Sequence, residues 1–72
     1  MKVLITGSNG LLGNKLIHLL SKKKNVEFLA TSRGENRFEN PTEINYQSMD
    51  ITNLDECIRI ILDFKPHCVI NT

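Results

Sequence analysis

The first thirteen residues read Met1-Lys2-Val3-Leu4-Ile5-Thr6-Gly7-Ser8-Asn9-Gly10-Leu11-Leu12-Gly13. Within them, Val3-Leu4-Ile5 is wholly apolar, which is typical of a parallel strand that is buried on both faces. Three glycines then follow at intervals of three residues and lead into a helical stretch. A buried strand, a glycine-rich turn and a helix in this order predict the start of an α/β fold.

The glycine turn has the features of a backbone site for a diphosphate. A helix N-terminus offers unpaired N–H donors and the positive end of the helix dipole. Gly7 permits a sharp turn out of the strand, while Gly10 lets the chain approach the phosphates and Gly13 lets the helix lie close to the strand. The alternative is a tight turn with no ligand. A Walker loop is excluded, because no Gly-Lys-Ser/Thr follows. The candidate binding residues here are Gly7, Asn9, Gly10, Leu11, Leu12 and Gly13.

A helix is predicted to follow the glycines and to end at residues 22–25. The three lysines of that segment suit the negative end of the helix dipole, so they are interpreted as a solvated helix end. They are the only basic run in a chain of net charge +1. The composition therefore predicts no nucleic-acid partner. The expected apolar face of the helix is Leu12, Leu16, Leu19 and Leu20, with Ile17 beside it.

Three further strands are predicted at residues 26–30, 44–49 and 68–70, from their apolar or alternating patterns. Residues 31–43 are polar and contain a glycine and a proline, so most of this segment is expected to be loop. Between the last two strands, Thr52 and Asp55 have the spacing of a capping box for a second helix. Its expected apolar face is Ile58, Ile61 and Leu62, with Ile60 adding to it, and Pro66 ends it.

The resulting order is β-α-β-β-α-β, which predicts right-handed crossovers and a parallel sheet. We expect an α/β, Rossmann-type sheet of order 3-2-1-4 with flanking helices. Residues 1–72 make less than one typical domain of about 100–150 residues, and the last residues directly follow an apolar strand. The expectation is therefore the N-terminal part of a doubly wound domain, with the remainder and a substrate domain absent.

Several other kinds of site are not expected. Cys57 and Cys68 have no second pair and no histidine at ligand spacing, so they predict free thiols in a reducing cytoplasm rather than a zinc site or a disulfide. His18 and His67 are interpreted as surface or structural residues. The apolar run at the N-terminus is too short for a signal peptide, and no stretch is long enough to span a membrane. A cytoplasmic protein with no membrane partner and no metal is expected.

The end of the second predicted strand bears on the choice of nucleotide. NAD-binding Rossmann folds place an acidic residue there, to bind the ribose 2′-hydroxyl. This chain has Thr31-Ser32-Arg33 instead. Arg33 offers a planar donor fork suited to a phosphate, and the hydroxyls of Thr31 and Ser32 could also donate. The sequence therefore favours NADPH, with NADH as the alternative cofactor. A solvated loop charge is the other interpretation of Arg33, and Arg37 could share the phosphate-binding role.

The stretch Thr6–Gly13 resembles the TGxxGxxG fingerprint of extended short-chain dehydrogenases/reductases. Within that superfamily, residues 1–7 and 64–72 resemble the dTDP-4-dehydrorhamnose reductase family. Residues 63–67 also resemble a turn in the regulatory beta subunit of methionine adenosyltransferase. The resemblance implies a parent protein that reduces a 4-keto sugar nucleotide with NADPH, giving dTDP-rhamnose. A homodimer is one option for its assembly.

The resemblance also assigns roles to individual residues. It implies that Asp50 accepts a hydrogen bond from the adenine amino group and that Ile51 packs on the ring; a plain helix cap is the alternative for Asp50. Asn71 and Thr72 would line the nicotinamide side. The catalytic Tyr/Lys pair would lie beyond residue 72, and Tyr46 is not that tyrosine because position 50 is Asp. The 72 residues alone are expected to be inactive. A non-catalytic regulatory subunit and an NAD-retaining epimerase or dehydratase remain as alternatives.

Overall fold

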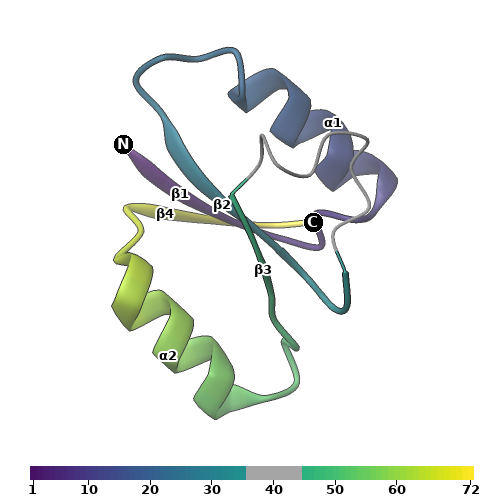
Figure 1. Ribbon diagram of the computed structural model, residues 1–72, viewed down its shortest axis with the longest axis vertical. Helices are drawn as coiled ribbons and strands as arrows, with labels where there is room; N and C mark the ends of the chain where they lie inside the picture. The colour runs from purple at the N-terminus through teal and green to yellow at the C-terminus, as the bar shows by residue number, and fades with distance from the viewer. Residues whose placement is uncertain (36–44) are drawn as a thin grey trace.

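The computed structural model describes residues 1–35 and 45–72. Its elements follow the predicted order β-α-β-β-α-β (Figure 1). Arg37, a predicted phosphate ligand, and Ile44, the predicted start of the third strand, lie outside the described residues. The observed elements are β1 (Lys2–Thr6), α1 (Leu11–Leu20), β2 (Glu27–Ser32), β3 (Tyr46–Ser48), α2 (Leu54–Phe64) and β4 (Cys68–Asn71).

The four strands form one parallel sheet in the order β3-β2-β1-β4. Leu4 of β1 lies in register with Leu29 of β2 on one side and with Val69 of β4 on the other. The two helices lie on opposite sides of this sheet, as Figure 1 shows. The predicted fold class and strand order are therefore confirmed.

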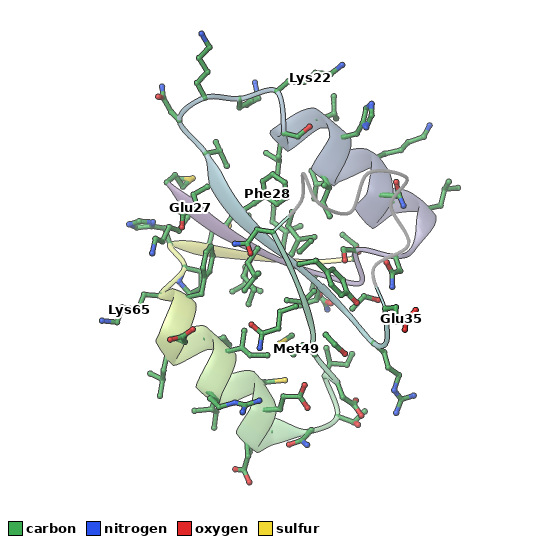
Figure 2. The ribbon with its side chains drawn as sticks, viewed as in Figure 1. Lys22, Glu27, Phe28, Glu35, Met49 and Lys65 are labelled. Atoms are coloured by element: carbon green, nitrogen blue, oxygen red, sulfur yellow. The ribbon has the colours of Figure 1, made fainter. Side chains whose placement is uncertain are left out.

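Side chains of β1 alternate between two hydrophobic cores, because successive residues of a strand point to opposite faces. Leu4 joins the core under α2, together with Leu29, Met49, Ile60 and Phe64. Val3 and Ile5 join the core under α1, together with Ile17 and Ala30. Figure 2 shows Met49 between the sheet and α2, whereas Lys22 and Lys65 lie at the outer ends of the helices. The prediction of a strand buried on both faces is correct.

The predicted apolar face of α1 is wrong in part. Leu12 and Leu19 are 68% and 62% exposed, whereas Gly13 and Ile17 are the buried residues of this helix. Gly13 lies against the backbone of the preceding turn. This contact rotates the helix so that the side containing Gly13 and Ile17, rather than the one containing Leu12 and Leu19, meets the sheet.

The predicted apolar face of α2 is wrong in the same way. Ile58, Ile61 and Leu62 are exposed, and only Ile60 of the predicted set is buried. Phe64 is the second buried residue, and Cys57 packs partly against the same core. These three residues recur at helical spacing on the side that faces β1 and β2. The sequence pattern therefore identified a helix but not the side that packs.

Several predicted boundaries also differ from the structure: α1 ends at Leu20 rather than at residues 22–25, and β3 ends at Ser48 rather than at residue 49. The second strand extends through Thr31 and Ser32, which were assigned to a loop, because these residues pair with Gln47 and Ser48 of β3. The N-cap of α2 is Asn53, whose side chain accepts a hydrogen bond from the Glu56 amide, so the capping box based on Thr52 is incorrect.

Candidate functional site

A pocket of about 360 Å³ lies at the carboxyl ends of the first three strands. Ligands of open parallel α/β sheets bind outside these strand ends. Five of the sequence-predicted site residues line the pocket, whereas the other five belong to the adjoining glycine turn and do not line it. The lining residues are Gly7, Thr31, Ser32, Arg33, Met49, Asp50, Ile51 and Thr52.

Two of the glycines in the turn are required by the fold itself. Gly7 has φ +69°, a left-handed conformation that favours glycine. At Gly13, an added Cβ would lie 2.5 Å from the Gly7 carbonyl oxygen and 2.8 Å from Ser8 Cα. Both neighbours are backbone atoms, which cannot easily move away. The close approach of α1 to β1 therefore depends on Gly13, as predicted.

Gly10 differs from Gly7 and Gly13, because few protein atoms lie where its side chain would be. An added Cβ would meet only the Gly7 carbonyl oxygen, at 3.3 Å, and the residue is exposed. The Gly10 amide donates to the same carbonyl oxygen at 3.0 Å. The open side of Gly10 leaves space for a ligand to approach the backbone at the start of α1.

The N-termini of α1 and α2 are capped differently. In α2, the Asn53 side chain caps the helix, and Asp55 and Glu56 in the first turn complement the positive end of its dipole. In α1, the N-cap is Gly10, no side chain caps the helix, and the first turn contains no acidic residue. The positive end of the α1 dipole is therefore not offset by an acidic residue or by a side-chain cap, and this arrangement suits an anion.

The remaining residues of the turn frame this N-terminus. Leu11 and Leu12 are 83% and 68% exposed, so their side chains leave the turn on the solvent side. The Asn9 side chain donates to the Glu35 carbonyl oxygen at 2.8 Å, and the Ser8 amide donates to the Thr31 carbonyl oxygen at 3.0 Å. These contacts tie the turn to the end of β2 and to the segment that follows it.

The end of β4 also holds the glycine turn, a role that sequence reasoning missed. The Thr72 hydroxyl donates to the Thr6 carbonyl oxygen at 2.6 Å and lies 3.1 Å from that of Gly7. The Thr6 hydroxyl donates to the Asn71 side chain. Residues 6 and 72 are far apart in the chain, so no local sequence signal announces this contact. The structure places Asn71 and Thr72 beside the glycine turn.

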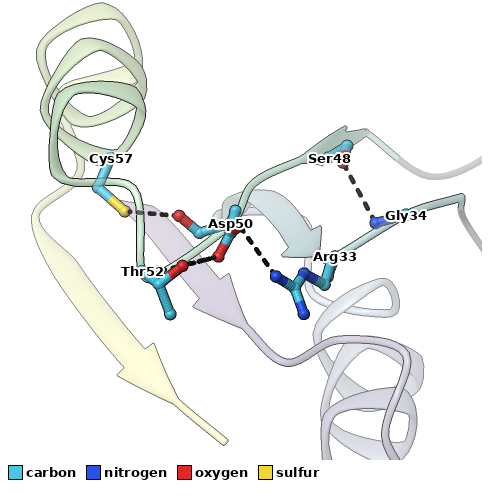
Figure 3. Close-up of polar contacts among 6 residues, drawn as sticks. All are labelled: Arg33, Gly34, Ser48, Asp50, Thr52 and Cys57. Carbon is cyan, nitrogen blue, oxygen red and sulfur yellow. Dashed lines mark hydrogen bonds and ion pairs between the residues drawn. The ribbon is translucent and has the colours of Figure 1, made fainter.

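Arg33, Asp50 and Thr52 form a connected polar group at the pocket (Figure 3). Asp50 Oδ1 accepts two hydrogen bonds from Thr52, from the amide at 2.9 Å and from the hydroxyl at 2.6 Å. Asp50 Oδ2 accepts from Arg33 Nη2 at 3.2 Å. The bonds from Thr52, and then the Arg33 guanidinium, hold the pKa of the Asp50 carboxyl below its ordinary value. Asp50 is thus an anion at neutral pH, and it is not the N-cap of α2.

Tyr46 shapes the same region from β3. Its hydroxyl lies 3.0 Å from the Ser32 carbonyl oxygen and 2.7 Å from that of Gly34. The Gly34 amide in turn donates to the Ser48 hydroxyl at 3.3 Å (Figure 3). These bonds fix the backbone on either side of Arg33. Tyr46 therefore supports the segment that carries Arg33, a role that sequence reasoning did not assign.

The histidines and cysteines form no site of their own within residues 1–35 and 45–72. His67 Nδ1 accepts from the Lys2 amide at 2.9 Å, which attaches the start of β4 to β1. Both cysteines are free thiols. In the described ranges, no three metal-ligating side chains are grouped to hold an ion, and neither of the helices there has the length and apolarity needed to cross a membrane.

Comparisons with known proteins agree with this geometry. Residues 1–72 match the family described as RmlD substrate binding domain. The chain is 36% identical over 70 residues to a dTDP-4-dehydrorhamnose reductase from Aggregatibacter actinomycetemcomitans; the match covers 97% of this chain and 19% of that protein. The chain thus spans about a fifth of the length of this relative. Its fold is similar to the X-ray structure of an L-threonine dehydrogenase from Clostridium difficile, with a TM-score of 0.82, 24% identity, and coverage of 97% of this chain and 23% of the other.

Proposed function

Because the chain belongs to the family of the RmlD substrate binding domain, we propose that its 72 residues form the cofactor-binding N-terminal part of an NADPH-dependent reductase of 4-keto sugar nucleotides. The observation that carries this proposal is the uncapped, acid-free N-terminus of α1 next to an open Gly10. It adjoins a pocket at the strand ends that contains Arg33. One elongated dinucleotide would use both features.

The residues present fit such a cofactor. The backbone amides at the start of α1 would hold the diphosphate, admitted by Gly10, while Gly7 and Gly13 shape the turn. The pocket would hold the adenosine half, with Ile51, which is 65% exposed, packing on the ring. Asp50 retains one acceptor position on Oδ2 for the adenine amino group, because Arg33 uses only one there.

The choice of NADPH over NADH rests on the end of β2. No carboxylate stands at Thr31, Ser32 or Arg33 to bind a ribose 2′-hydroxyl. Arg33 lines the pocket instead, and its side chain is 80% exposed, so its guanidinium can be reached by a ligand phosphate. Ser32 lines the same pocket and would add a hydroxyl donor.

When bound, NADPH supplies the hydride that turns the 4-keto group into an alcohol, while a proton completes the product. The name of the relative, dTDP-4-dehydrorhamnose reductase, supports that compound as the substrate and dTDP-rhamnose as the product. The groups that polarise the carbonyl and donate the proton would lie outside these 72 residues. The chain by itself would bind cofactor without turnover, in a cytoplasm that keeps Cys57 and Cys68 reduced.

A substitution at Gly10 tests the proposal in the whole protein to which these residues belong. Gly10→Val should lower NADPH affinity at least tenfold, because the side chain occupies the approach to the α1 amides. Isothermal titration measures the affinity, and thermal unfolding checks that the variant is folded. Lys15→Val, on the exposed side of the same helix, is the matched control and should bind normally.

Two results would contradict the proposal at different levels. An unchanged affinity in the folded Gly10→Val variant would remove the diphosphate site. Tight NADPH binding by a whole protein that does not reduce a 4-keto sugar nucleotide would leave the site in place but exclude the reductase, and would favour a regulatory subunit. A tightly retained NAD would favour an epimerase or dehydratase.

A further inference from the structure

Arg33 needs help to act as a selective phosphate ligand. Its side chain is long and 80% exposed, and a free arginine loses much rotamer freedom when it binds a ligand. Within the described part of the chain, Asp50 is its only ion-pair partner, through a single contact at 3.2 Å. The position of the guanidinium at the pocket therefore depends on how Asp50 is oriented.

Asp50 is itself oriented by Thr52. The amide and the hydroxyl of Thr52 both donate to Oδ1, at 2.9 and 2.6 Å, and so occupy both acceptor positions of that oxygen. Two donors on one oxygen fix the rotation of the carboxylate. The other oxygen, Oδ2, is thereby presented to Arg33 (Figure 3). All three residues line the same pocket.

This arrangement leaves most of Arg33 available to a ligand. Only Nη2 contacts Asp50, and within residues 1–35 and 45–72 the remaining N–H donors of the guanidinium fork are available to a phosphate. The negative charge of Asp50 repels an approaching phosphate. Its hydrogen bond to Arg33 Nη2 favours phosphate binding, because it holds the guanidinium in place. Thr52 orients the carboxylate for this hydrogen bond and adds no charge of its own.

We infer that Thr52 is a positioning residue for cofactor selection: its hydroxyl orients Asp50, which holds the Arg33 guanidinium at the pocket for a 2′-phosphate. The inference rests on the proposed function and deepens it, because it names the residue that makes Arg33 selective. It also gives Thr52 a use other than the helix cap that its sequence position suggests. The amide of Thr52 serves the same purpose but is common to any residue at that position.

The test compares NADPH and NADH affinities in the whole protein by isothermal titration. Thr52→Val keeps the branched shape and removes the hydroxyl, and Thr52→Ser restores a hydroxyl as the matched control. Thr52→Val should lower the ratio of NADPH to NADH affinity about fivefold to tenfold, as expected for the loss of one typical hydrogen bond. Thr52→Ser should leave the ratio within about twofold of the original.

A second measurement shows whether Thr52 acts through Arg33. In a protein that already has Arg33→Ala, Thr52→Val should no longer change the affinity ratio, because the group it positions is gone. If Thr52→Val lowers the ratio equally with and without Arg33, the inference is wrong. Thr52 is exposed, so both variants should fold; Thr52→Ala is a second hydroxyl-free variant for the same comparison.

The outcomes separate this inference from the proposed function. An unchanged ratio in Thr52→Val, or an equal loss of both affinities, overturns the role of Thr52 while NADPH binding by the original protein still supports the site. If the original protein binds neither dinucleotide, the proposed function fails and the inference fails with it. A loss of affinity that is confined to NADPH in Thr52→Val and absent in Thr52→Ser supports both the inference and the proposed function.

Discussion

At the scale of single residues, charge at the pocket is set by a few short contacts. The carboxylate of Asp50 accepts three hydrogen bonds, two of them from Thr52 and one from Arg33. All three stabilise the ionised carboxylate, and together they lower the pKa of Asp50. Arg33 was predicted from the sequence as a phosphate ligand, but its pairing with Asp50 depends on two segments that only the sheet brings together.

The lowered pKa of Asp50 makes its contribution to stability dependent on pH. A group whose pKa is lower in the folded state stabilises that state above its ordinary pKa of 3.8, and this contribution disappears as the pH falls through the folded value. In the whole protein, Asp50→Asn should therefore lower the melting temperature at pH 7, and the difference from the original should shrink below pH 4 or so.

Thermal unfolding followed by circular dichroism between pH 7 and pH 2 measures this difference. The effect should be small, because Arg33 is exposed to solvent and salt screens the pair. Asp63→Asn, at an exposed position of α2, serves as the control. A difference between Asp50→Asn and the original that persists unchanged to pH 2 would contradict the assigned cause.

At the scale of elements, the contact between α1 and β1 depends on one missing side chain. Gly13 is buried, and α1 passes directly over the backbone of the turn that leaves β1. This contact sets the side of α1 that meets the sheet, and thereby leaves Leu12 and Leu19 exposed. The same approach brings the N-terminus of α1 beside the strand ends, where the pocket lies.

Gly13→Ala should destabilise the whole protein even though alanine favours helices by about 1 kcal/mol over glycine. The new Cβ would lie 2.5 Å from the Gly7 carbonyl oxygen, so α1 or the turn must shift. Overpacking of this kind costs about 1–3 kcal/mol, which outweighs the gain in helix propensity. Chemical denaturation measures the free energy of unfolding.

Lys15→Ala, at an exposed position of the same helix, is the control and should change stability by less than about 0.5 kcal/mol. A Gly13→Ala protein as stable as the original would show that α1 does not depend on this close approach. Reduced NADPH affinity in the destabilised but folded variant would further indicate that the position of α1 and the proposed diphosphate site are linked.

At the scale of the whole molecule, the described chain leaves apolar surface uncovered. Leu54, Ile58 and Leu62 are exposed along α2, and Val69 is 49% exposed on β4. β4 is also an outer strand of the four-stranded sheet. Exposed apolar patches and strand edges are sites where another chain or another part of the same chain can pack. In the proposed larger parent protein, further parts of the chain would cover these apolar side chains and the edge of β4.

The isolated 72-residue chain should therefore associate with itself. Light scattering after size-exclusion chromatography should show a mass that rises with concentration, because strand β4 can pair with a second copy. Val69→Lys, which puts a charge on that strand, should reduce the association. Leu19→Lys, at an exposed position of α1 rather than on the outer strand of the sheet, is the matched control. A monomer at all concentrations would refute the prediction.

The sequence by itself determined the order of the elements, the parallel sheet and the glycine turn. It did so because glycine conformations, apolar runs and helical periodicity act between near neighbours in the chain. It did not determine which side of each helix is buried, where β2 ends or that Arg33 pairs with Asp50. Those features depend on how the helices pack on the sheet and on contacts such as Arg33 with Asp50 and Thr72 with Thr6. Partners that distant in sequence are chosen by the tertiary structure, because only folding brings their atoms within reach.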